Sequence, residues 1–125
     1  MHFIGIIFVF LAAIIHIYIW ILESFLWTKR ETAKMFGLSV HEAKATKALA
    51  FNQGFYNLFL AIVTLVGIAL FLTGSWVPGY VLIIAGAGSM VLAGSVLYLS
   101  DSTKIRAVLV QVTAPIIGII LLSLM

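Results

Sequence analysis

The sequence has no cysteine and very few charged residues. Without cysteine there is no disulfide and no thiolate ligand for a metal ion. Charged residues make up only 9% of the chain, whereas 64% of its 125 residues are hydrophobic. Soluble domains carry about 25% charged residues, and a water-facing surface cannot be built with so few. The composition therefore excludes a soluble globular domain and indicates that lipid covers most of the folded chain.

Four hydrophobic runs are each long enough to cross a bilayer, which takes roughly 20 residues of helix. They cover about residues 3–26, 48–72, 78–99 and 105–124, and a polar loop occupies about residues 28–47. We therefore predict an all-α, polytopic protein with a single membrane domain over residues 1–125. Because the later connections are short, the expected architecture is an up-down-up-down bundle of four transmembrane helices in the lipid bilayer.

The basic residues all fall on one side of this predicted bundle. Lys104 and Arg106 follow the third run, while the stretch 73–79 and both termini carry no lysine or arginine. The other five basic residues lie between the first two runs: Lys29, Arg30, Lys34, Lys44 and Lys47. By the positive-inside rule we expect the basic loops in the cytoplasm and both termini outside, in a cell (inner or plasma) membrane. Basic residues placed in this way determine orientation, so we expect no nucleic-acid binding despite the net charge of +3.

Three local patterns give further expectations. Gly37 ends a stretch of helix formers, and the S-x-x-E pattern from Ser39 to Glu42 is typical of a helix start, so the second helix is expected to begin near Val40. The loop at Asp101 can cap the fourth helix. The third run repeats small residues every four positions, and we interpret this pattern as packing within the molecule rather than between copies: Ala85, Ser89 and Ala93.

Polar residues interrupt three of the four hydrophobic runs. At 100° per residue, one narrow face of the first helix carries His16, Trp20, Glu23 and Trp27. The second helix carries Asn52, Gln53, Tyr56 and Asn57, and the fourth carries Gln111. Ionisable groups inside a membrane are costly, so Glu23 and His16 are the first candidates for a functional role.

The depths of these polar residues agree. Glu23 is six positions from Lys29, Asn52 and Gln53 are five and six from Lys47, and Gln111 is five from Arg106. At the rise of an α-helix, all lie about 8–9 Å inside the cytoplasmic charges. We therefore predict a polar small-molecule pocket in the cytoplasmic half. Its expected ligand-binding residues are Trp20, Glu23, Trp27, Asn52, Gln53, Tyr56, Asn57 and Gln111.

Each residue also has a purely structural interpretation. Glu23 can reach the interface or pair with Lys47, and His16 can be a hydrogen-bonded packing residue. The amides can bond between helices, which contributes only about 1 kcal/mol per bond. His16 and Glu23 are seven residues apart, too far to share one ion alone, so we expect neither a metal site nor a cofactor.

The spacing of these residues resembles a known family. The segment His16-x-Tyr18-x4-Glu23-x3-Trp27 is followed by Asn52-Gln53-Gly54-x-Tyr56-Asn57-x2-Leu60-Ala61 and by Gln111-x3-Pro115. Together these motifs resemble the DUF1304 family over essentially the whole chain. The family's function is unknown, so the resemblance implies a four-helix membrane fold with a shared polar core and supplies no reaction.

Three functional hypotheses follow. The first is proton-coupled transport of an amphipathic or cationic compound by a homodimer. Here Glu23 is the exchanging carboxylate, Trp20 and Tyr56 are walls, and His16 is a second proton site. The size, helix number and acid position are similar to those of small multidrug exporters, although the Asn-Gln-Gly block is not part of their pattern.

The second hypothesis is a membrane-embedded, isomerase-like enzyme in which the catalytic residues His16 and Glu23 act as acid and base on a lipophilic substrate. This set of residue types is similar to that of membrane sterol isomerases, but no motif carries over. The third hypothesis is a non-catalytic scaffold in which the amides pair with one another.

Overall fold

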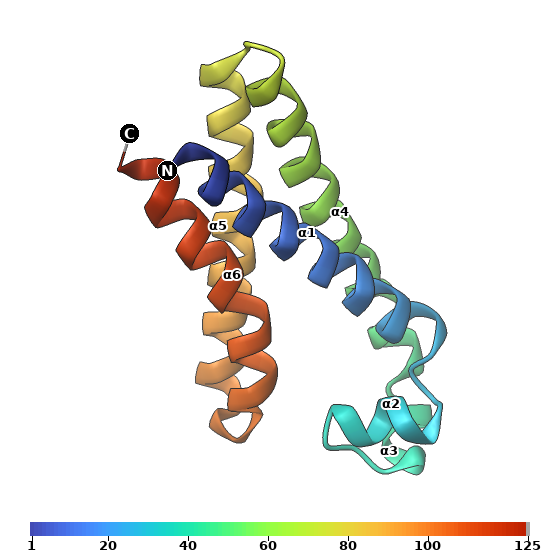
Figure 1. Ribbon diagram of the computed structural model, residues 1–125. Coiled ribbons are helices and arrows are strands. Elements are labelled where there is room, and N and C mark those ends of the chain that lie inside the picture. The colour runs from blue at the N-terminus through green and yellow to red at the C-terminus, as the bar shows by residue number, and fades with distance from the viewer. Residues whose placement is uncertain (125) are drawn as a thin grey trace.

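The computed structural model describes residues 1–124 and contains helices but no strand over that range (Figure 1). Its long helices are α1 (His2–Phe25), α4 (Lys47–Leu72), α5 (Trp76–Ser100) and α6 (Ile105–Ser123). Two short helices, α2 (Arg30–Met35) and α3 (Val40–Ala45), follow α1, and the 3-10 turn η1 (Ser102–Lys104) precedes α6. Four helices are long and apolar enough to cross a membrane, so the predicted four-helix fold is confirmed.

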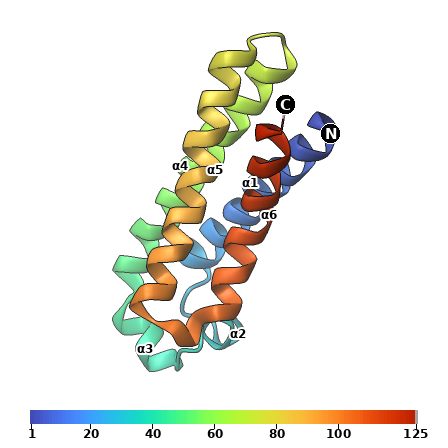
Figure 2. The ribbon, with the colours of Figure 1, turned by 90° about the vertical axis from the view of Figure 1, so that its left-hand side faces the viewer.

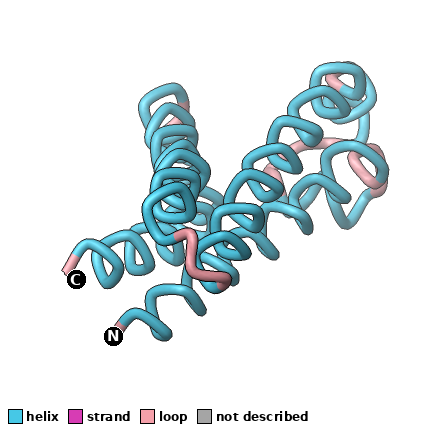
Figure 3. The backbone as a smooth tube through the Cα atoms, turned by 90° about the horizontal axis from the view of Figure 1, so that it is seen from above, coloured by secondary structure: helices cyan, strands magenta, loops and turns pink. Residues whose placement is uncertain are grey.

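The long helices form a ring in which α1 and α5 each pack between α4 and α6. Both termini and the α4–α5 turn lie at one end of the bundle, and α2, α3 and η1 lie at the other (Figures 1 and 2). Figure 3, which looks down from the first end, shows the two termini near each other. All the basic residues therefore lie toward the same end of the bundle, which we call the basic end.

The apolar core is concentrated toward the termini. Its main cluster joins the four helices there through buried Ile6, Val9, Ile68, Ile83, Ala87 and Leu122. A second cluster, nearer the middle of the bundle, is made of Ala12, Met90 and Ala114. Toward the basic end the pair α1 and α4 diverges from the pair α5 and α6 (Figure 1). The polar residues of α1 and α4 that lie toward the basic end are therefore separated from the main apolar cluster.

Glycines set the closest helix contacts. A Cβ on Gly67 of α4 would lie 2.7 Å from the backbone nitrogen of Ile83 in α5, and one on Gly118 of α6 would lie 3.0 Å from that of Val9 in α1. The small residues of the third hydrophobic run, which were expected to make such contacts, do not point inward. Ala85 and Ala93 face outward, and Ser89 is partly exposed. The inward positions of α5 are instead Gly79, Ile83, Gly86, Ala87, Met90 and Gly94.

The loop after α1 departs from one expectation. As predicted, Gly37 has a positive φ of 70° after α2, and the Ser39 side chain accepts a hydrogen bond from the Glu42 amide at the start of α3. This helix does not continue into the membrane, however, because it ends before Thr46. The Thr46 hydroxyl donates back to the Glu42 carbonyl at 3.0 Å, and α4 starts afresh at Lys47. At the other loop, the Asp101 carboxylate accepts hydrogen bonds from the Thr103 hydroxyl and from the Thr103 amide, which caps η1. These two hydrogen bonds lower the pKa of Asp101.

Candidate functional site

The polar face of α1 packs against α4. The Ser24 hydroxyl donates to the Phe51 carbonyl at 2.9 Å, which ties the two helices together near the basic end. Gly54 makes this approach possible, because a Cβ at that position would overlap the Ser24 hydroxyl oxygen. The glycine within the Asn-Gln-Gly block is therefore required by close packing of α4 on the residues around Glu23.

Glu23 is held inside this interface. Its side chain is only 5% exposed, and Asn57 Nδ2 donates to Glu23 Oε2 at 3.1 Å. Among residues 1–124 no basic group pairs with this carboxyl, so the expected alternative of a pair with Lys47 is not formed. An ionisable group with a single amide partner in a membrane span is unusual, because such groups normally find a counter-charge or reach water.

His16 and Trp20 continue this face deeper into the span. His16 is fully buried, and its Nδ1 lies 2.8 Å from the Ala12 carbonyl. Trp20 packs edge-on against Phe55 of α4 with ring centroids 5.7 Å apart, and against Phe25 at 5.4 Å. The Trp20 indole thus belongs to an aromatic cluster between α1 and α4 with Phe25, Phe51 and Phe55.

Trp27 sits at the basic end of the same face. Its Nε1 donates to the Thr46 hydroxyl at 3.1 Å, and its ring lies 4.8 Å from that of Phe36. Trp27 therefore anchors the loop helices to α1, and it has a protein partner for its indole N–H.

The remaining polar residues of α4 point elsewhere. Asn52 and Gln53 are exposed, and Asn52 Nδ2 donates to the Ala48 carbonyl of its own helix at 3.1 Å. The Tyr56 side chain is 66% exposed. Of the four polar residues predicted on this helix, only Asn57 reaches Glu23.

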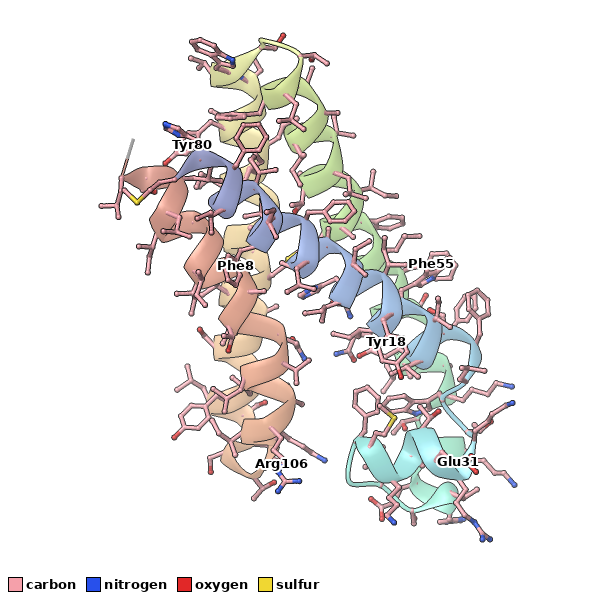
Figure 4. The ribbon with its side chains drawn as sticks, in the orientation of Figure 1. Phe8, Tyr18, Glu31, Phe55, Tyr80 and Arg106 are labelled. Carbon is pink, nitrogen blue, oxygen red and sulfur yellow. The ribbon has the colours of Figure 1, made fainter. Side chains whose placement is uncertain are left out.

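Gln111 lines a different space, a cleft of about 170 Å³ between α1, the end of α2 and α6. In Figure 4, Arg106 lies at the lower end of α6 and Phe55 lies beyond α1 on the other side. The Lys104 ammonium donates to the Phe36 carbonyl and so connects the two sides of the cleft at the basic end. The cleft is lined by Ile15, Tyr18, Ile19, Leu22, Met35, Phe36, Arg106, Ala107, Val110 and Gln111.

The eight predicted ligand-binding residues therefore do not surround one pocket. Glu23 and Asn57 meet between α1 and α4, Gln111 lies in the cleft toward α6, and Asn52, Gln53 and Tyr56 face outward. Sequence reasoning missed Tyr18 and Arg106 in the cleft, and it missed Ser24, whose position next to Glu23 was the available signal. Within residues 1–124, no three His, Asp or Glu side chains come together in a way that could hold a metal ion.

The geometry describes a small multi-pass membrane protein with a buried acid between its first two long helices. Its sequence matches the family described as "Protein of unknown function (DUF1304)" over residues 10–123, and the chain belongs to that family. The resemblance inferred from the polar motifs is thereby confirmed. Neither the curated proteins nor the solved structures provide a match.

Proposed function

We propose that a homodimer of this protein exchanges a lipophilic cation for protons, with Glu23 as the carboxylate that binds one or the other. The observation that carries the proposal is the state of Glu23, which is buried in a membrane span with Asn57 as its one hydrogen-bond donor and no basic partner among residues 1–124. A structural carboxylate is expected to have a counter-charge. One that is kept free of it can take a proton or a cation in turn.

The surroundings of Glu23 suit a cation of this kind. Trp20 and the phenylalanines around it place aromatic rings along the same interface, one turn from the carboxyl. The faces of aromatic rings attract cations, most strongly where water is excluded. A lipophilic cation would therefore bind through its charge to Glu23 and through its apolar groups to Trp20, Phe25 and Phe55.

Replacing Glu23 with glutamine is expected to abolish this exchange. With tetraphenylphosphonium as the probe and the full chain in nanodiscs, at a pH at which Glu23 carries its proton, the wild type should release about one proton per cation bound. Glu23→Gln should release none and bind about tenfold more weakly, because the opposite charge is lost. Infrared difference spectra should show the protonated Glu23 carboxyl band disappearing as the wild type binds the cation.

Glu31→Gln is the matched control, because Glu31 is an exposed glutamate of α2 and should bind and release as the wild type does. Unchanged tetraphenylphosphonium binding in Glu23→Gln would contradict the proposal and favour a scaffold role. If a strictly monomeric chain exchanged the cation for protons, the homodimer would no longer be part of the proposal.

We also propose that the basic end faces the cytoplasm of a cell membrane and that both termini face outside. This orientation follows from the positive-inside rule, since all seven basic residues lie toward that end. Because the chain has no cysteine, single cysteines report it directly. Ser75→Cys, in the α4–α5 turn, should react with a membrane-impermeant maleimide on intact cells. Ser102→Cys, in η1, should react only after permeabilisation, and the reverse pattern would invert the topology.

A membrane-embedded isomerase is the second candidate, and the observation in its favour is the placement of His16 on the same face as Glu23. Their separation of seven positions corresponds to about 10 Å along the helix, so an acid and a base would act at separate positions of one lipophilic substrate. This reaction would be favoured over exchange if product formed without any ion gradient and if both His16→Phe and Glu23→Gln abolished its formation.

A further inference from the structure

Two buried polar atoms on α1 have no hydrogen-bond partner among residues 1–124: His16 Nε2 and Trp20 Nε1. The two residues are four positions apart, so their side chains lie on one face of the helix, with Cβ atoms about 6 Å apart. His16 itself is 0% exposed. Buried polar atoms are nearly always paired, so two unpaired atoms on adjacent turns of one helix call for an explanation.

The two atoms have opposite hydrogen-bonding roles. His16 Nδ1 lies 2.8 Å from the Ala12 carbonyl oxygen, which can only accept, so Nδ1 carries the proton. In the neutral ring, Nε2 is then a free acceptor. An indole nitrogen has only a donor. The face therefore presents one acceptor and one donor, one helical turn apart, and the structure does not join them to each other.

The walls around this face offer no substitute partner. Trp20 is packed against the rings of Phe25 and Phe55. The contacts of Gly54 with Ser24 and of Asn57 with Glu23 set the antiparallel register of α1 and α4, which places residues 61–64 at the level of His16. Of these, Ala61 is apolar, and the buried Thr64 hydroxyl donates to the Leu60 carbonyl of its own helix at 2.8 Å. One turn beyond His16, Ala12 packs with Met90 and Ala114. Among residues 1–124 neither the Thr64 hydroxyl nor any other protein group bonds to the two nitrogens, so their pairing is left to a guest group.

We propose that His16 and Trp20 together bind one hydroxyl group. Its oxygen accepts the indole proton of Trp20, and its own proton is donated to His16 Nε2, so both atoms are satisfied by a single group. Two sources supply this chemistry: an internal water and the hydroxyl of a lipophilic alcohol that reaches the α1–α4 interface from the membrane. The site needs no charge and no proton exchange, so it stands or falls independently of the carboxyl chemistry at Glu23.

The test uses the full chain, labelled with ¹⁵N-tryptophan and ¹⁵N-histidine, in nanodiscs. The chain has three tryptophans, and Trp20→Phe, which keeps a ring but removes the N–H, assigns the Trp20 indole signal. Trp27→Phe and Trp76→Phe assign it by elimination if that variant does not fold. Magnetisation transfer to each indole proton is then measured from water and from added 1-decanol, with decane as the matched ligand without a hydroxyl. Trp27 is the internal control, since its N–H already bonds to Thr46.

If magnetisation transfer from water to the Trp20 indole proton persists after 1-decanol is added, the bound group is an internal water. Transfer that decanol replaces, and decane does not, identifies a lipophilic alcohol. In either case His16→Phe should weaken the transfer about fivefold or more, because the hydroxyl loses its acceptor. The proposal is overturned by a ¹⁵N–¹⁵N coupling that reports a direct indole–imidazole bond, by an unchanged signal in His16→Phe, or by contact with neither water nor decanol.

Discussion

Gly67→Ala is expected to destabilise the protein by about 2–3 kcal/mol, because the added methyl group would press against the backbone of a neighbouring helix. The added Cβ would lie 2.7 Å from the Ile83 nitrogen and 2.9 Å from the Gly79 carbonyl oxygen. Both are backbone atoms of α5, so no side chain can rotate away and the two helices must move apart. The measurement is the free energy of unfolding in mixed micelles, titrated with a denaturing detergent.

Gly88→Ala is the matched control. Gly88 also lies within a long helix, but a Cβ there would meet no atom within 4 Å. Because alanine favours helix over glycine by about 1 kcal/mol, this variant should be as stable as the wild type or slightly more so. Equal destabilisation in the two variants would show that α4 and α5 do not touch at Gly67.

Asn57→Leu is expected to lower the free energy of unfolding by about 2 kcal/mol, whereas Asn57→Leu combined with Glu23→Leu should recover most of that loss. An ordinary hydrogen bond between membrane helices contributes only about 1 kcal/mol. Here the group left alone is a buried carboxyl, and stranding a buried polar group costs about 1–3 kcal/mol. Removing both partners leaves nothing unpaired, so the two losses should not add.

Asn52→Leu controls for the change of residue type. Its amide bonds to the Ala48 carbonyl of its own helix and faces outward, so leucine there should be tolerated without loss. Additive losses in the Glu23 and Asn57 double variant would mean that the bond between the two side chains is not formed in the membrane.

The hydrophobic runs were sufficient to predict the four long helices, because length and apolarity alone decide whether a segment can span a bilayer. The polar site was harder to predict, because depth along a helix does not specify direction around it. Asn52 and Asn57 are five residues apart and so point about 140° away from each other. Only Asn57 faces α1, while Asn52, which was placed level with Glu23, faces outward.

Gln111 shows a second reason why the polar site was hard to predict from the sequence. It was placed at the depth of Glu23, but it belongs to α6, which meets α1 on the side away from α4. Which helices become neighbours is decided by glycine contacts such as those of Gly67 and Gly118, and these depend on atoms from two segments far apart in the sequence. Likewise, no pattern around Ser39 revealed that Thr46 would end the helix seven residues later.

The glycine contacts near the termini have a consequence for access. Gly67 holds α4 on α5, and Gly118 with Gly5 holds α1 on α6, all in the half of the bundle away from the basic end. A molecule that reaches Glu23 from the basic end or sideways from the lipid is therefore blocked from moving further toward the termini by these close backbone contacts. Passage to the opposite leaflet requires these helix pairs to separate, and without that movement the proposed exchange of cation for protons would be open to one leaflet alone.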